Sequence, residues 1–332
     1  MRLPRMLAFG ASTLVLLSAC STGGSSTAPS SAPSSAASSA PSAGASVPAS
    51  PIGAGAPTIK VGSDGFYEAK LMAEIYAEAL EAQGFTVDRT GIGIGARKVS
   101  APALESGQID LKPEYIGSGL AFYEPGKQTG DPAANRTALQ TVLDGKGGGI
   151  TVLDFSPAVD TNAFVVRKET ADALKLTKLS DVAPVQDQLK WGLATDCPTN
   201  PVCAKALKDA YGLAPKNVTP LAACDQPMVD ALAGKTVDVG ELCSTQPDII
   251  KNGWVTLADD KSTQPADNIA PLVRNDYLSK VADKSGFEKI LNDVSAKMTT
   301  DELLKLNSQF VFDKKDLAVI AKAWLQANGF VQ

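Results

Sequence analysis

The sequence predicts an α/β protein built from two lobes with a ligand cleft between them. Short apolar runs typical of strands alternate with segments whose apolar residues recur at helical spacing, and this alternation is the pattern of an α/β sheet. The pattern runs once over residues 58–155 and restarts at residue 164. The chain after residue 56 is long enough for one two-lobed unit or for two ordinary domains.

The first block opens with a short apolar strand and a long helix that ends at Gly84. The expected strands are residues 58–62, 85–89, 109–111 and 150–155, and the expected helices are residues 66–83, 97–106 and 135–143. The glycine-rich residues 91–95 are expected to form a tight connection into the helix that starts at Arg97. Their GxGxG spacing does not match the GxGxxG fingerprint of a dinucleotide-binding loop.

The second block repeats the alternation and is followed by a helical carboxyl-terminal region. Its expected strands are residues 164–167, 191–194, 237–242 and 254–257, and its expected helices are residues 169–174, 202–211 and 228–233. After residues 268–274 the remainder is helical, at residues 287–298, 301–309 and 315–328. Thr300 is the expected N-cap of the middle helix of these three.

Four segments are expected to face the cleft, because ligands of open α/β sheets bind beyond the carboxyl ends of the strands. They are residues 63–67, 113–118, 160–162 and 244–246. The candidate ligand-binding residues are Ser63, Asp64, Tyr67, Tyr115, Ser118, Thr161, Asn162, Ser244, Thr245 and Gln246. Two of these positions have a purely structural alternative. Tyr115 offers either a π face to a cation or a packed core ring. Ser244 either caps a helix or helps its N-terminus to hold a carboxylate.

The amino terminus is expected to be a lipoprotein signal peptide. Arg2 and Arg5 form a short basic region, and residues 11–17 are mostly apolar and too few to span a membrane. The small residues that follow end at Cys20, which would carry the lipid. The alternative is an ordinary signal peptide with a chance cysteine.

A long tether follows the lipobox. No charged residue occurs between Arg5 and Lys60, and residues 21–56 are nearly all Ser, Ala, Pro and Gly. Such a composition buries too little apolar surface to offset the entropy of ordering, so this segment is expected to be disordered. The expected location of the protein is extracytoplasmic, lipid-anchored to the bacterial cell membrane.

The cysteine count is odd, and assigning Cys20 to the lipid leaves four. In an oxidising compartment these four are expected to form two disulfides. Three pairings are possible, and we favour Cys197–Cys203 with Cys224–Cys243. A zinc site is the rival interpretation; it is disfavoured because the chain has no CxxC spacing and no histidine.

Charge and composition exclude several functions. The formal net charge of −5 gives no support for nucleic-acid binding, which normally requires a basic surface. The absence of histidine excludes Ser-His-Asp and Cys-His catalysis. Carboxylate or lysine catalysis is not excluded by the composition, but no motif in the sequence indicates it. We expect a protein that is not an enzyme and that carries no cofactor and no metal.

Several motifs together resemble the substrate-binding proteins of ABC importers for glycine betaine, choline and related osmoprotectants. The resemblance spans residue 59 to the end. It is carried by Val61-Gly62-Ser63, residues 72–76, residues 102–107 with 109–111, Pro113-Glu114-Tyr115, residues 160–166, Cys197-Pro198-Thr199 and residues 264–268.

The resemblance implies a type II periplasmic-binding fold, with two α/β lobes joined by two crossover strands and a cleft that closes by a hinge. The crossovers would be residues 160–162 and 265–268. The implied division is a signal peptide at 1–20, a tether at 21–56, lobe 1 at 57–160 with 267–332, and lobe 2 at 161–266. The implied partners are a small quaternary ammonium or polar solute and an ABC permease with its ATPase, and the receptor is expected to be a monomer.

The resemblance also implies a ligand site in which tyrosines cage an ammonium group, while Arg, Lys or helix N-termini hold a carboxylate. Tyr115 matches a cage tyrosine and Ser118 a nearby hydroxyl. Asp64 stands where the family usually has lysine, and Ala163 where cage-bearing members have tyrosine. Phe66, Tyr67 and Tyr123 are candidates to compensate. The alternatives are a binding lipoprotein for a different solute and a solute sensor without a permease.

Overall fold

The computed structural model describes residues 51–332, and its strands and helices confirm the predicted α/β class. The lipobox and residues 21–50 of the tether lie outside the described residues. Residues 51–56, which we assigned to the tether, instead form a turn against lobe 1. Ile52 packs on the lobe 1 core, and the Gly53 amide donates to the Gln83 carbonyl at 2.9 Å. The folded part of the chain therefore begins before residue 57. The physical reason is that Ile52 buries its apolar side chain against lobe 1.

Lobe 1 is built on a mixed five-stranded sheet in the order β2-β1-β3-β10-β4. The strands are β1 (Ile59–Asp64), β2 (Val87–Gly95), β3 (Leu111–Tyr115), β4 (Ile150–Val152) and β10 (Ile269–Arg274). β1 runs parallel to β2 and β3, whereas β10 runs antiparallel to β3 and β4. The parallel strands therefore end at one edge of the sheet.

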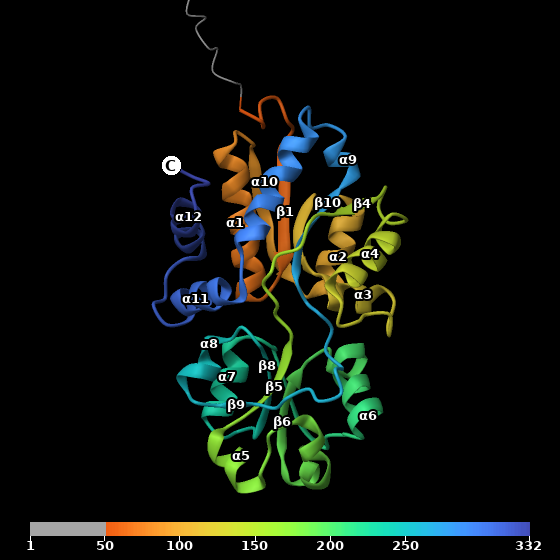
Figure 1. Ribbon diagram of the computed structural model, residues 1–332, viewed down its shortest axis with the longest axis vertical. Helices are drawn as coiled ribbons and strands as arrows, with labels where there is room; N and C mark the ends of the chain where they lie inside the picture. The colour runs from red at the N-terminus through yellow and green to blue at the C-terminus, as the bar shows by residue number, and fades with distance from the viewer. Residues whose placement is uncertain (1–50) are drawn as a thin grey trace, which may run out of the picture. The chain divides into compact units, whose positions relative to one another are not determined.

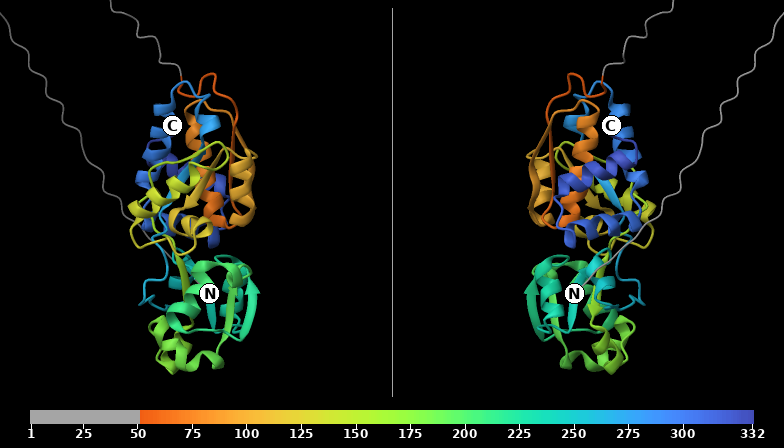
Figure 2. Two further views of the ribbon diagram at one scale, coloured as in Figure 1. Left: turned by 90° about the vertical axis from the view of Figure 1, so that its right-hand side faces the viewer. Right: turned by 90° about the vertical axis from the view of Figure 1, so that its left-hand side faces the viewer.

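Helices cover both faces of this sheet (Figure 1). One face packs against α1 (Tyr67–Ala82), α10 (Lys284–Lys297), α11 (Thr300–Val311) and α12 (Leu317–Ala327). The other face carries α2 (Arg97–Ser106), α3 (Ile116–Tyr123) and α4 (Pro132–Leu143), and the short α9 (Asn275–Leu278) follows β10. The carboxyl-terminal helices, blue in Figure 2, share a lobe with the amino-terminal elements, orange, so lobe 1 is assembled from two separate stretches of chain.

Lobe 2 has a second five-stranded sheet, in the order β7-β6-β8-β5-β9. Its strands are β5 (Asn162–Val166), β6 (Lys190–Ala194), β7 (Asn217–Leu221), β8 (Val239–Cys243) and β9 (Val255–Thr256). Its α-helices are α5 (Lys168–Leu174), α6 (Ala206–Tyr211), α7 (Gln226–Ala233) and α8 (Pro247–Lys251). Short helical segments of other types span Leu179–Gln188, Cys197–Thr199 and Pro201–Lys205. None of the helices in residues 51–332 combines the length and apolar character needed to cross a bilayer.

Two chain segments cross between the lobes side by side (Figure 1). They lie at the crossovers predicted from the sequence, residues 160–162 and 265–268. Val159 and Asn268 form an antiparallel bridge, and the Asp160 amide donates to the Asp267 carbonyl at 3.0 Å. The segment between these crossovers holds Cys197–Cys203 and Cys224–Cys243, so the predicted disulfide pairing is confirmed.

Some local predictions were wrong. Residues 91–95 continue β2, since Gly91 pairs with Gly62 and Gly95 with Asp64. A Cβ on Gly91 would lie 2.4 Å from the Ile109 side chain, so these glycines permit close strand packing and do not form a turn. The N-cap of α11 is Thr299, whose hydroxyl accepts the Glu302 amide, and not Thr300.

The strand β7 was missed because it lacks an apolar pattern. It lies at the edge of the lobe 2 sheet, its residues are exposed or half-buried, and it contains Pro220. Proline is tolerated in edge strands because one side of such a strand needs no ladder hydrogen bonds. The omission matters because residues that follow β7 line the cavity described next.

Candidate functional site

A cavity of about 370 Å³ lies between the lobes, where the parallel strands of both sheets end. Lobe 1 supplies Asp64, Gly65, Phe66, Ala96, Arg97, Lys98, Tyr115 and Ser118. The crossovers supply Asp160, Thr161, Asn162 and Asp267. Lobe 2 supplies Ala194, Thr195, Asp196, Asn200, Val202, Ala222, Ala223, Cys224, Asp225, Glu241 and Cys243. The wall thus combines residues that are far apart in the sequence.

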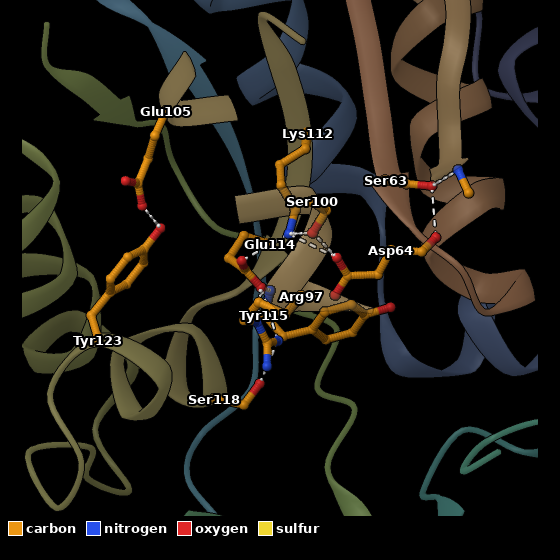
Figure 3. A network of polar contacts seen from close by, with 11 residues as sticks. Ser63, Asp64, Arg97, Ser100, Glu105, Lys112, Glu114, Tyr115, Ser118 and Tyr123 are labelled. Atoms are coloured by element: carbon orange, nitrogen blue, oxygen red, sulfur yellow. Dashed lines mark hydrogen bonds and ion pairs between the residues drawn. The ribbon is translucent and has the colours of Figure 1, made fainter. Parts of the chain in front are cut away.

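A buried lysine organises the lobe 1 wall (Figure 3). The fully buried Lys112 amino group donates to Asp64 Oδ1 at 2.9 Å, Ser100 Oγ at 2.9 Å and Glu114 Oε2 at 3.0 Å. Burial acts to raise the pKa of Asp64, but the charges of Lys112 and Arg97 outweigh it, so this pKa is lowered. Asp64 is therefore an ionised partner of Lys112.

Arg97 extends this network to the cavity surface. Its guanidinium donates to Glu114 Oε1 at 2.9 Å and to Ser118 Oγ at 2.8 Å. The Ser118 amide in turn donates to Asp267 Oδ1 at 2.6 Å. Burial raises the pKa of Asp267 to about 6, although the Ser118 amide and the Arg97 charge act against this. The cations Lys112 and Arg97 are thus already paired with carboxylates of their own lobe.

Two aromatic rings face the cavity from lobe 1. Phe66 and Tyr115 have ring centroids 5.5 Å apart and an interplanar angle of 40°. The other two aromatic candidates lie elsewhere: Tyr67 stacks on Phe310, and Tyr123 donates to Glu105 and packs under Lys146. Among the described residues, Phe66 and Tyr115 are the aromatic groups of the wall.

A buried carboxyl behind Tyr115 joins the two lobes. Glu68, on the first turn of α1, accepts the Tyr115 hydroxyl at 2.7 Å, the Thr245 hydroxyl of lobe 2 at 2.6 Å and the Asn307 amide of α11 at 2.6 Å. The Asn307 side chain also donates to the Thr245 carbonyl at 3.2 Å. Burial raises the pKa of Glu68, although the hydrogen bonds from Thr245, Asn307 and Tyr115 act to lower it.

The crossover carboxyl Asp160 holds the start of the loop after β8. Its Oδ1 accepts the Ser244 hydroxyl and the Thr245 amide, both at 3.2 Å, and the Ser244 Oγ accepts the Thr161 amide at 3.0 Å. Burial, followed by the charge of Glu68, raises the pKa of Asp160 well above its usual range. Ser244 therefore bonds to the first crossover, and the predicted N-cap role was wrong because Gln246 occupies that position.

Both disulfides shape the lobe 2 wall. The Cys197–Cys203 loop presents Asn200 and Val202, and the Cys224–Cys243 bridge itself lies in the wall. Glu241, in the middle of β8, is 1 % exposed and accepts the Ala194 amide at 2.8 Å. Burial raises the pKa of Glu241 to about 7; the Ala194 bond opposes this shift and the Asp196 charge adds to it.

Half of the predicted ligand-binding residues line this cavity: Asp64, Tyr115, Ser118, Thr161 and Asn162. The other five lie behind or beside it. The Ser63 hydroxyl accepts the Gly93 amide, Tyr67 packs on α11, and Thr245 and Gln246 are buried at the lobe contact. Ser244 borders a different hollow, which it shares with Thr161 and Asn162.

Sequence reasoning missed Arg97, Lys98, Asp196, Asn200, Asp225, Glu241 and Asp267. The strand-end rule would have found Asp196, since residues 191–194 were a predicted strand. Asp225 follows β7, the strand that was not recognised. Glu241 had no usable signal, because a single carboxylate within an apolar strand pattern does not reveal which space it faces.

The chain matches the family model described as the substrate binding domain of ABC-type glycine betaine transport systems over residues 57–327. The chain belongs to this family. Its members are solute-binding transport proteins that serve ABC importers, as the sequence predicted. The betaine-type motifs identified in the sequence fall within the matched range.

Relatives in two bacteria support the family assignment along most of the chain. The glycine betaine-binding protein YehZ of Escherichia coli (strain K12) is 28 % identical over 296 residues, which cover 85 % of this chain and 94 % of YehZ. The carnitine transport binding protein OpuCC of Listeria monocytogenes is 24 % identical over 283 residues, covering 84 % of this chain and 90 % of OpuCC.

Solved structures of family members confirm the predicted type II periplasmic-binding fold. A glycine betaine/carnitine/choline ABC transporter protein superposes with a TM-score of 0.65 at 22 % identity, covering 82 % of this chain and 99 % of the other. Apo YehZ from Escherichia coli superposes with a TM-score of 0.59 at 25 % identity, covering 83 % of this chain and all of YehZ. Within this shared fold, the wall of the present cavity holds two aromatic rings and six carboxyl groups.

Proposed function

We propose that this protein is the lipid-anchored, extracytoplasmic receptor of an ABC importer for small quaternary ammonium osmoprotectants. It binds its solute in the cavity between the lobes and delivers it to a membrane permease. The observation that carries the proposal is the cavity itself, which lies at the strand ends of both lobes and beside paired crossovers. Closing the lobes around a ligand creates the form that a permease distinguishes from the empty receptor.

The cavity favours a small cationic solute. Its acidic residues are Asp64, Asp160, Asp196, Asp225, Glu241 and Asp267, against the basic residues Arg97 and Lys98. Phe66 and Tyr115 offer π faces to an ammonium group. We propose Tyr115, Ser118, Thr161 and Asn162 as ligand contacts, whereas Thr245 and Glu68 join the lobes.

A thermal-shift screen of the full-length protein in detergent tests the proposal. Glycine betaine, choline, carnitine, proline and ectoine form the panel. A bound solute at 100 times its Kd should stabilise the protein by about 2.7 kcal/mol. Failure of every quaternary ammonium compound to raise the melting temperature would refute the proposed solute class.

The aromatic contribution is tested by Phe66→Leu, which keeps the apolar volume but removes the ring. Loss of a cation–π contact of about 0.5–2 kcal/mol should weaken quaternary ammonium binding by roughly 2- to 30-fold. Phe122→Leu is the matched control, because Phe122 is 40 % exposed and is not among the residues of the cavity wall. Equal Kd values for both variants and the wild type would show that the ring contributes nothing.

A further inference from the structure

Glu241 is a buried carboxyl with one free oxygen in the cavity wall. It is 1 % exposed, and its Oε2 accepts the Ala194 amide at 2.8 Å. Cys203 Sγ lies 3.3 Å from the same oxygen, but it is bonded to Cys197 and has no proton to donate. Both of these contacts are made by Oε2, and no hydrogen bond to the second oxygen, Oε1, is found within residues 51–332. Glu241 lines the cavity, so this oxygen is the one available to a solute.

No cation of the described residues pairs with Glu241. The side chain that acts on it through charge is Asp196, which is also acidic. Lobe 2 contributes Asp196, Asp225 and Glu241 to the wall and neither Lys nor Arg, while Arg97 and Lys98 come from lobe 1. Asp64 and Glu114, by contrast, are paired with Lys112 at 2.9 and 3.0 Å.

Glu241 lacks the paired cation that Asp64 and Glu114 have, and this difference affects the free energy of its ionised form. A buried carboxylate without a partner is costly, and the group responds by holding its proton, which is why burial raises the pKa of Glu241 to about 7. A cationic solute entering the cavity supplies the missing charge. Its attraction to the carboxylate is strong because Glu241 is buried and little screened by water.

We propose that Glu241 is the cation-recognition residue of the cavity. The positive group of the solute binds against the lobe 2 wall and pairs with the Glu241 carboxylate. This inference deepens the proposed function and rests on the cavity being the solute site. It assigns the cationic end of the solute to lobe 2, opposite Arg97 and Lys98. It also predicts that cations with and without a carboxylate both bind.

Glu241→Gln tests the proposal with minimal change of shape. The glutamine oxygen still accepts the Ala194 amide, so the melting temperature of the empty protein should not fall. Calorimetry of the full-length protein at pH 8 with choline and with glycine betaine should show binding weakened about tenfold or more. Glu169→Gln is the control, because this lobe 2 carboxylate has a side chain that is 59 % exposed and is not part of the wall.

A proton readout separates recognition from a structural role. At pH 7, binding of choline should drive Glu241 to ionise and release a proton, seen as a binding enthalpy that depends on the buffer. The Glu241→Gln protein should lose this release. Both proteins keep the other ionisable groups of the wall, which are Asp64, Arg97, Lys98, Asp160, Asp196, Asp225 and Asp267. The difference between them therefore reports Glu241.

The outcomes distinguish this inference from the proposed function. Equal Kd values for wild type and Glu241→Gln with a quaternary ammonium compound would overturn the inference and leave the function standing. A second outcome is that the wild type binds no quaternary ammonium compound but binds the diamine putrescine, and that Glu241→Gln does not bind putrescine. This outcome would support the role of Glu241 and refute the proposed solute class. Binding confined to neutral or anionic solutes would overturn both.

Discussion

At the scale of single residues, the cavity holds two buried carboxyl systems of opposite character. Asp64 and Glu114 share Lys112; Arg97 also donates to Glu114, and the Ser100 hydroxyl also donates to Asp64. Glu241 has an amide donor but is paired with no cation of residues 51–332. The first system is neutralised by cations of its own lobe and shapes the wall, whereas in the second burial favours the protonated carboxyl, which we propose ionises when a cationic solute binds.

Lys112→Met should strongly destabilise the protein. It leaves Asp64 and Glu114 buried without their shared cation, a change that typically costs about 3–5 kcal/mol. Chemical denaturation measures the loss. The control is Lys168→Met, which removes a surface ion pair with Asp172 and should cost less than about 1 kcal/mol. Similar losses for both variants would contradict the role assigned to Lys112.

Glu241 should make stability fall as pH rises from about 4.5 to about 7. In this window the folded protein holds a proton on Glu241 that the unfolded chain has lost, because burial raises the pKa from 4.5 to about 7. The free energy of unfolding then decreases by up to about 1.4 kcal/mol per pH unit.

The comparison with Glu241→Gln isolates this effect, because Asp267 and Asp160 titrate in both proteins and shift in the same direction. The variant should gain stability over the wild type as pH rises through this window, and should keep that gain above pH 7. Denaturation curves at several pH values check this. Parallel curves for the two proteins would show that the pKa of Glu241 is not raised.

At the scale of elements, strand ends and disulfide-closed loops build the site together. β1 and β3 deliver Asp64 and Tyr115 to the wall from lobe 1. In lobe 2 the Cys197–Cys203 disulfide closes the loop after β6, and the Cys224–Cys243 disulfide links the loop after β7 to the end of β8. The element order could be predicted from the sequence because apolar spacing is a local property. The edge strand β7 could not, because edge strands need not be apolar.

The two disulfides should contribute unequally to stability. Cys224 and Cys243 are 19 residues apart and Cys197 and Cys203 are 6 apart, so the first bridge restricts the unfolded chain more. The chain-entropy relation predicts that replacing Cys224 and Cys243 by serine costs roughly 1 kcal/mol more than replacing the other pair. Thermal unfolding of both double variants measures the difference. The reverse order would indicate that native contacts outweigh chain entropy.

At the scale of the whole molecule, hydrogen bonds next to the crossovers join the lobes. Glu68 and Asn307 of lobe 1 hold Thr245 of lobe 2, and Asp160 holds the amide of the same residue. These bonds lie beside the crossovers and not at the far rim of the cavity. We predict that they act as a pivot when the lobes open.

Thr245→Val should loosen this pivot. It removes the donor to Glu68 at nearly constant volume, leaving a buried carboxyl with fewer bonds. We expect a larger radius of gyration for the empty protein in small-angle X-ray scattering and weaker solute binding. Thr256→Val is the control, because Thr256 is an exposed residue of β9. An unchanged radius of gyration and Kd would refute the pivot.

The lipobox prediction belongs to the same scale. Cys20→Ala should prevent lipidation and release the protein from the membrane fraction, because no second anchor is predicted in the sequence. Immunoblotting of separated membrane and soluble fractions measures this. A variant that stays with the membranes would contradict the proposed anchor.

The sequence by itself determined the α/β class and the family, because these follow from apolar spacing and from motifs that are contiguous in the chain. It implied the two crossovers through the family resemblance and favoured one of three disulfide pairings, which the structure then confirmed. Only the tertiary structure decided the electrostatics of the cavity. Lys112 meets Asp64 across 48 positions, and Glu241 lines the cavity without forming an ion pair within the described part of the chain. Whether a buried charge is neutralised depends on which distant groups folding brings within a few ångströms, and a local pattern does not contain that information.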